Sequence, residues 1–379
     1  MMTTDSAGRQ SLNAVFGDAI TSSREPDILV QFVYNAATDD VTTATSGTGA
    51  VSVASATATL TTGATTGAAS LTSVDTIRYQ PGFDGYCYFT AAFSGSDAGS
   101  AARIGLFDAN DGMFLEHSGG VAYAAIRAGA VDSKIALTPL PFKAADLDWT
   151  KINIFRIGYG WLGVAPVAFE VYSGLVDGWV VLHAFELLNK QIVPSTFQPA
   201  LPITASVSRT SGSGSITLKS CSWSAGRVGR AGILSSDRPF GSANSKAGVT
   251  TEVAILSVKN AATFQGKTNR VVIEVDLLSL STDGAKNATF YVKKGVTLGG
   301  SPNFVDVDVV NAVASVDKSG TTVTGGALVL PINLAKVESK FLQVQDLRLR
   351  IRPGETLTIS GTSANANDLA AAIRWRGLF

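Results

Sequence analysis

The feature that most constrains this chain is a succession of short runs in which apolar and polar residues alternate, each ended by a glycine-rich reversal. Examples of these reversals are 80–82 (Gln-Pro-Gly), 118–120 (Ser-Gly-Gly) and 211–214 (Ser-Gly-Ser-Gly). Alternation with a period of two places apolar side chains on one face of a β-strand. Reversals about eight to fifteen residues apart let each strand turn back after it crosses a sheet. The pattern predicts an all-β protein with antiparallel, jelly-roll-like β-sandwich domains.

Two groups of such runs divide the chain. Its 379 residues are enough for two domains with a core each. Between the groups, residues 224–230 replace the alternation with glycine and arginine. We expect an N-terminal arm over 1–24, a first sandwich over 25–225, a linker over 226–248 and a second sandwich over 249–379. The arm either becomes ordered by docking on a neighbouring molecule or is a plain flexible terminus.

The expected strands are the alternating runs themselves. In the first sandwich they cover 28–34, 76–79, 86–93, 103–107, 121–128, 151–159, 165–172, 178–185, 203–209 and 215–223. In the second they cover 251–258, 269–280, 288–293, 301–310, 327–330, 345–351, 356–360 and 369–375.

Two runs of the second sandwich carry specific expectations. Val271, Ile273, Val275 and Leu277 are expected on one face of a strand. Residues 348–352 (Arg-Leu-Arg-Ile-Arg) are expected to form a half-buried strand whose guanidinium groups face solvent or a partner. A nucleic-acid-binding stripe is the less favoured interpretation of these arginines.

A low-complexity tract of threonine, alanine, serine and glycine covers 36–73. Within it, residues 50–60 alternate small apolar and hydroxyl side chains, and 61–63 (Thr-Thr-Gly) closes the run as a turn. Side chains this small on both faces predict close packing of the sheets. No helix longer than about ten residues is expected, and the best candidates are 12–20 and 366–373.

The charge composition points towards assembly. Charged residues make up only 16% of the chain, against about 25% in an average globular domain. The 30 basic and 30 acidic residues give a formal net charge of zero, unlike a nucleic-acid-binding protein. Repulsion between copies is therefore weak, which suits a subunit that contacts its neighbours.

The N-terminal residues 1–9 are polar, and no segment approaches 18 uninterrupted apolar residues. We therefore expect no membrane insertion, and synthesis and assembly in the cytoplasm. The two cysteines, Cys87 and Cys221, each lie in an aromatic, strand-like context. Two buried thiols are the favoured interpretation and a disulfide is the alternative.

Residues that could carry catalysis or hold a metal are few. His117 and His183 have no metal-ligand spacing, and His183 is expected to be a strand residue. Residues 108–112 (Asp-Ala-Asn-Asp-Gly) resemble the start of a calcium loop but lack its terminal glutamate, so a hairpin turn is favoured. We expect no catalytic residue, no metal and no cofactor.

Two kinds of sugar chemistry stay open as alternatives. A carboxylate pair for glycoside hydrolysis meets in space and not in sequence, and Asp146, Asp148 and Glu170 are its candidates. Tyr159 and Trp161, between two expected strands, are candidate glycan contacts because aromatic rings are the usual platform for sugars. A core or turn role is the favoured alternative for Trp161.

Residues 75–225 also resemble a known group of proteins in several segments that occur in the same order. Segments similar to those of concanavalin-like jelly-roll sandwiches are Ile104–Asp108, Gly112–Phe114, Lys151–Phe155, Trp161–Val164 and Phe169–Gly174. Segments similar to those of certain bacteriophage virion proteins are Arg78–Gly82, Val181–His183 and Leu201–Ile203. The second sandwich resembles, more weakly, the accessory sandwiches that follow in such proteins.

This resemblance implies a non-enzymatic structural subunit of a phage tail, baseplate, fibre or head appendage. Such a subunit is made in the host cytoplasm and assembles through sheet edges and its N-terminal arm. The expected partners are copies of itself, as a trimer by analogy, and other virion proteins. A carbohydrate-binding module that attaches to a host surface glycan is the alternative, and a glycan hydrolase or lyase is the third candidate.

Overall fold

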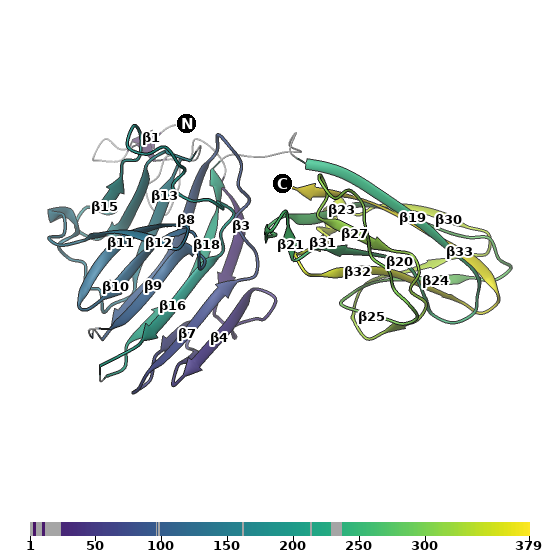
Figure 1. The fold of residues 1–379 in the computed structure, drawn as a ribbon, viewed down its shortest axis with the longest axis horizontal. Helices are drawn as coiled ribbons and strands as arrows, with labels where there is room; N and C mark the ends of the chain where they lie inside the picture. Colours follow the sequence, from purple (N-terminus) through teal and green to yellow (C-terminus); the bar gives the residue numbers. More distant parts are fainter. Residues whose placement is uncertain are drawn as a thin grey trace. The chain divides into compact units, whose positions relative to one another are not determined.

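The computed structural model describes residues 3–4, 10–11, 24–95, 97, 99–160, 163–212, 214–228 and 237–379. The chain divides into two compact units, 1–231 and 232–379, and each contains antiparallel sheets (Figure 1). Among the described residues, the only helices are two short 3-10 turns, η1 (Phe142–Ala144) and η2 (Gln345–Leu347). The predicted all-β class, built from antiparallel β-sandwiches, is confirmed.

Two sheets enclose the core of the first unit, to which both contribute alternate side chains, including the fully buried Leu106, Phe155 and Phe169. The seven-stranded sheet runs, in spatial order, β12 (Val131–Ala136), β11 (Val121–Ala128), β10 (Gly112–Ser118), β9 (Ser100–Phe107), β16 (Ile203–Arg209), β7 (Gly67–Ser73) and β4 (Val41–Gly47). The nine-stranded sheet runs β15 (Gly178–Phe185), β14 (Val167–Ser173), β13 (Asn153–Tyr159), β8 (Asp84–Ser94), β17 (Thr217–Ser220), β6 (Thr57–Thr61) and β5 (Ala50–Ala54), with β18 (Ser222–Val228) beside β8 and β3 (Arg24–Gln31) beside β18.

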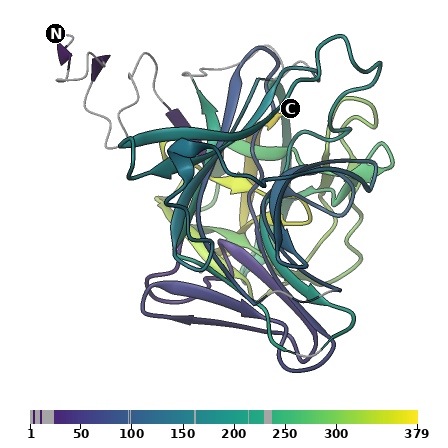
Figure 2. The same cartoon turned by 90° about the vertical axis from the view of Figure 1, so that its left-hand side faces the viewer.

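The low-complexity tract forms four strands, which Figure 2 shows in purple and blue along one side of the first unit. The alternating run at 50–60 forms two strands, β5 and β6, with a reversal that the alternation does not mark. The chain reverses between them at Ser55 and Ala56, whose φ angles are 51° and 56°. Because no glycine marks this left-handed turn, alternation alone could not reveal it.

Close packing within this tract agrees with the expectation from its small side chains. A Cβ atom added at Gly49 would lie 1.9 Å from the carbonyl oxygen of Ala68. Ala58 and Leu60 are fully buried, and Ala69 is 2% exposed. Backbone thus packs against backbone here, which larger residues would prevent.

Two sheets also enclose the core of the second unit, around Trp375, Phe290 and Leu278. The five-stranded sheet runs β19 (Asp237–Val249), β33 (Asn367–Leu378), β23 (Val272–Thr282) and β30 (Ser339–Gln343), with β31 (Arg350–Ile351) also beside β23. The six-stranded sheet runs β26 (Val305–Asp306), β27 (Ala314–Asp317), β20 (Val253–Asn260), β32 (Thr356–Ser363), β24 (Ala288–Lys294) and β29 (Ala327–Leu334). Two-stranded ribbons are β1 (Thr3–Thr4) with β2 (Gln10–Ser11), β21 (Thr263–Phe264) with β22 (Lys267–Thr268), and β25 (Thr297–Leu298) with β28 (Val323–Thr324).

The predicted linker is wrong. Backbone hydrogen bonds between strands can hold a long strand even where its side chains lack the apolar alternation on which the prediction relied. The expected linker over 226–248 contains the end of β18 and most of β19, which pairs with β33 from Asp237 onwards. Residues 366–373, one of the two helix candidates, lie almost entirely in β33, which contains the strand predicted over 369–375. Nearly all of the N-terminal arm, 1–24, lies outside the described residues.

The expected strand over 345–351 is also mostly wrong. Residues 345–347 form η2, and Arg348 follows with a positive φ of 47°, so only Arg350 and Ile351 are in a strand. The segment 76–79 is likewise no strand, although the N–H of Ile77 bonds to the carbonyl of Leu201.

A β-bulge in β23 shifts the alternation that the sequence predicts. The register against β33 changes between Val275 and Leu277, so Leu278 and not Leu277 is fully buried. The extra residue, Asp276, lies on the opposite face with only 2% of its side chain exposed. A bulge that inserts one residue reverses the faces of all residues that follow it.

The buried Asp276 carboxylate is compensated by an arginine network. The Nε atom of Arg376 donates to Asp276 Oδ1 at 3.0 Å, and a terminal nitrogen of Arg374 lies 3.6 Å from Asp276 Oδ2. Arg376 also pairs with Glu274 at 3.1 Å and with Asp237 at 3.4 Å. A buried charge stays ionised without a large penalty only when such partners are present.

We expect Arg376→Met to lower the free energy of unfolding of this unit by about 3–5 kcal/mol, because it leaves the buried Asp276 charge largely uncompensated. The matched control is Arg374→Met, whose side chain is 53% exposed. This control should lower stability by less than about 1 kcal/mol. Urea denaturation followed by circular dichroism measures both, and equal losses would contradict the assignment.

Gly49→Ala should destabilise the first unit by about 1–3 kcal/mol, since its methyl group would collide with the Ala68 backbone. The control is Gly178→Ala, where the nearest atom to the added methyl is the Val176 carbonyl oxygen at 3.7 Å. That substitution should change stability by no more than about 0.5 kcal/mol. A tolerated Gly49→Ala would show that the two segments are not in close contact.

Candidate functional site

An aromatic cluster lies on the outer face of the nine-stranded sheet. Tyr86 and Tyr88 alternate along β8 with the core residues Cys87 and Phe89, so they point away from the core. The ring centroid of Tyr88 lies 5.4 Å from that of Tyr86 and 5.5 Å from that of Trp179 on β15. Tilted aromatic pairs at this spacing attract one another.

An ion pair strengthens this cluster. Arg156 on β13 donates from Nε to Glu170 Oε2 at 2.6 Å and from a terminal nitrogen to Glu170 Oε1 at 2.9 Å. Its guanidinium carbon lies 4.4 Å from the centroid of the Trp179 ring, within range of a cation–π interaction. Burial alone would lower the pKa of Arg156, but the hydrogen bonds and charge interactions with Glu170 and Tyr88 together outweigh burial, so the pKa is raised.

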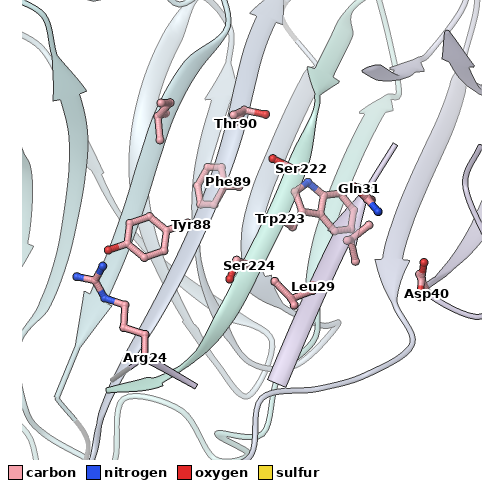
Figure 3. Close-up of a pocket in the computed structure, with 12 residues that line it drawn as sticks. Arg24, Leu29, Gln31, Asp40, Tyr88, Phe89, Thr90, Ser222, Trp223 and Ser224 are labelled. Atoms are coloured by element: carbon pink, nitrogen blue, oxygen red, sulfur yellow. The ribbon is translucent and has the colours of Figure 1, made fainter. Parts of the chain in front are cut away.

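Next to the cluster, small side chains leave a slot in the same face. In one cross-strand row Ser224 of β18 lies between Tyr88 of β8 and Leu29 of β3. The slot has a volume of about 630 Å³, and Figure 3 shows the residues that line it. It is lined by Arg24, Leu29, Val30, Gln31, Asp40, Tyr88, Phe89, Thr90, Ile154, Ser222, Trp223 and Ser224.

The slot offers polar groups from side chains. Thr90 Oγ1 accepts a hydrogen bond from the Cys221 N–H at 2.8 Å and keeps its own hydrogen to donate. The side chains of Gln31 and Ser222 have no hydrogen-bond partner within the described part of the chain. Such groups can bind a polar ligand without first breaking a bond inside the protein.

The sequence-predicted aromatic residues lie elsewhere. Tyr159 is 8% exposed and belongs to the core, where its ring packs over Gly85. Burial raises the pKa of its hydroxyl well above the usual value. This burial runs against the expected glycan contact at Tyr159, because no face of the ring is open to a sugar. Trp161 lies outside the described residues.

The three candidate carboxylates have separate partners. Asp146 accepts a hydrogen bond from the Ser173 hydroxyl at 2.9 Å, and Asp148 accepts from the backbone and hydroxyl of Thr150. Glu170 forms the ion pair with Arg156. Each of the three carboxylates therefore has its own hydrogen-bond donor among the described residues.

Residues 108–112 form the predicted hairpin turn between β9 and β10, in which Asp108 Oδ1 accepts from the N–H groups of Asn110 and Asp111. His183 lies on β15, as predicted, with its ring 4.6 Å from that of Phe185. Burial lowers the pKa of both His183 and His117. Over 24–228 and 237–379, apart from positions 25, 96, 98, 161, 162 and 213, no three His, Cys, Asp or Glu side chains are grouped for a metal.

Both cysteines are free thiols, so the disulfide alternative is wrong. Cys87 is fully buried, and burial raises the pKa of its thiol. Cys221 is partly exposed and lies 3.6 Å from the Thr57 hydroxyl. Cys87 is not placed to act as a nucleophile, because its raised pKa removes the reactive thiolate.

Sequence reasoning missed the residues that line the slot. The alternation at 86–89 does place Tyr86 and Tyr88 on one face, and the buried Trp223 places Ser222 and Ser224 on the other face of β18. The sequence does not reveal the strand register that places Tyr88 beside Ser224. These two residues are 136 positions apart in the chain.

No protein-family model and no curated protein sequence matches the chain. Solved structures that are similar to part of this chain include the following three. Lectin I-B4 from Griffonia simplicifolia is 13% identical over 52% of this chain and 98% of its own, with a TM-score of 0.35. A legume lectin-like domain from Entamoeba histolytica is 10% identical over 49% and 89%, with a TM-score of 0.32. The CBM2 module of the evolved Dit of Lactobacillus casei BL23 phage J-1 is 12% identical over 56% and 99%, with a TM-score of 0.39.

At these identities and scores, the likenesses identify no ligand or activity for this chain. No described helix has the length and apolar character needed to cross a membrane.

Tyr86 gives the stability of the first unit a predicted pH dependence. Burial raises the pKa of its hydroxyl to about 12, although a hydrogen bond with Ser224 acts in the opposite direction. An unfolded tyrosine titrates near pH 10, so this contribution is complete below about pH 10 and is lost between about pH 10 and 12.

Urea denaturation at several pH values from about 9 to 12 should therefore show a falling free energy of unfolding, and Tyr86→Phe should make the fall less steep. Tyr34→Phe is the control because Tyr34 is 91% exposed. An identical slope in wild type and Tyr86→Phe would contradict this role of Tyr86.

Proposed function

We propose that this protein is a non-enzymatic structural subunit of a bacteriophage virion that assembles through the edges of its sheets. The observation that carries the proposal is an unprotected double edge formed by β4 and β5. β4 pairs only with β7 and β5 only with β6, so each strand has one side without a neighbour among the described strands. The free N–H and C=O groups of such an edge can pair with another chain.

The composition of this double edge favours contact with another molecule. Residues 41–54 contain no charged residue and no proline. Six of the seven residues of β4 are exposed, and Val41 alone is buried. Proteins that stay monomeric usually protect such edges with charges, proline or bulges. An edge without these devices is therefore expected to be covered in the assembled state.

Other edges of this chain carry the protective features that the double edge lacks. β12 contains Asp132 and Lys134, which pair with Arg127 and Glu116. β29 contains Pro331, which cannot donate a backbone hydrogen bond, and β30 contains Lys340. This contrast supports a specific contact along β4 and β5 over non-specific association through every sheet edge.

The remaining parts of the proposal rest on the sequence. The formal net charge of zero removes long-range repulsion between copies. The resemblance of residues 75–225 to phage virion proteins supports a place in a tail, baseplate, fibre or head appendage. The partners would be copies of this chain, with a trimer by analogy, and other virion proteins.

The proposal predicts an oligomer that depends on the double edge. Ala44→Lys with Ser52→Lys places a charge on each exposed strand and should shift the solution mass towards the monomer, by at least tenfold in dissociation constant. Sedimentation velocity of the whole chain measures this mass.

The charge-matched control is Ser133→Lys with Ser339→Lys, on the exposed edge strands β12 and β30, which already carry lysine. It should leave the mass unchanged. A wild-type chain that is monomeric at all concentrations and joins no virion particle would contradict the proposal.

A further inference from the structure

The floor of the slot cannot pair with an added strand. β18 pairs with β3 from Ser222 onwards and with β8 from Trp223 onwards, so both of its sides are occupied along most of the slot. Its backbone donors and acceptors are therefore already used, unlike those of the β4 and β5 edges. A ligand that lies on this floor must therefore be recognised by side chains.

The side chains that line the slot place hydroxyl groups on its floor and apolar groups on its walls. Ser222, Ser224 and Thr90 contribute the hydroxyls of the floor, and the Gln31 amide stands at the β3 side. Tyr88 and the 67% exposed Leu29 form opposite walls. They stand two strands apart, which is about 9–10 Å between backbones.

This lining selects against other ligand classes. An acyl chain would bury the hydroxyl and amide groups without hydrogen-bond partners, which is unfavourable. A phosphate or sulfate group would need several cations, whereas the lining contains one arginine, Arg24, and one aspartate, Asp40. Arg24 also lies over the Tyr88 ring, with its guanidinium carbon 5.2 Å from the centroid.

We propose that the slot between Tyr88 and Leu29 binds a neutral saccharide. A pyranose ring presents apolar C–H faces and a rim of hydroxyls, which match the apolar walls and the hydroxyl-lined floor. The Gln31 amide can both donate to and accept from such hydroxyls. This site lies on the outer face of the nine-stranded sheet and is separate from the β4 and β5 edges proposed for assembly.

The test is glycan binding by the whole chain and by a variant whose slot is filled. A printed array that contains both neutral and acidic glycans is the probe, followed by calorimetric titration of each glycan that binds. Ser222→Trp fills the slot at an exposed position without removing a hydrogen bond of the described residues. Ser206→Trp is the control, because it places the same ring on β16 of the other sheet.

The expected result is binding of at least one neutral glycan, weakened at least tenfold by Ser222→Trp and unchanged by Ser206→Trp. Failure of the wild-type chain to bind any neutral glycan would overturn the proposal, as would binding of acidic glycans alone. Equal loss in both variants would also overturn it.

A change of solution mass in Ser222→Trp without a change of glycan binding would instead identify the slot as an interface between copies, against this proposal. The assembly proposal is decided separately by the lysine variants of β4 and β5, so either can fail without the other.

Discussion

Backbone pairing along β8 is the constraint on which the rest of the first unit depends. This strand pairs with β13 on one side and with β17 and β18, one after the other, on the opposite side. Because side chains alternate along it, Cys87 and Phe89 enter the core while Tyr88 and Thr90 line the outer slot. One face of β8 therefore contributes to the core, and its other face contributes to the candidate site.

Small residues have two consequences in this fold. At Gly49 they let one backbone approach another, and at Ser222 and Ser224 they leave a slot between larger neighbours. In β4 and β5 they also leave edges that no charge protects. A chain with so few charged side chains must limit unwanted association by geometry, because electrostatic repulsion contributes little.

The second unit meets a different requirement. Its bulge shields Asp276 from water. Arg376 pairs with that carboxylate and also with those of Glu274 and Asp237. The three acidic partners of Arg376 come from β19 and β23, so the network connects the two neighbours of β33 through its own arginine. Removing one member of a buried charge network lowers stability more than replacing the whole network by apolar residues would.

The sequence by itself determined the β class, most strands and the hairpin at 108–112, because alternation and turn residues are local properties. Only the tertiary structure decided the rest. The turn at Ser55, the bulge at Asp276 and the burial of Tyr159 over Gly85 depend on what lies across the sheet. The slot likewise exists because the register sets Ser224 between Tyr88 and Leu29, and register is fixed by pairing between segments distant in the chain.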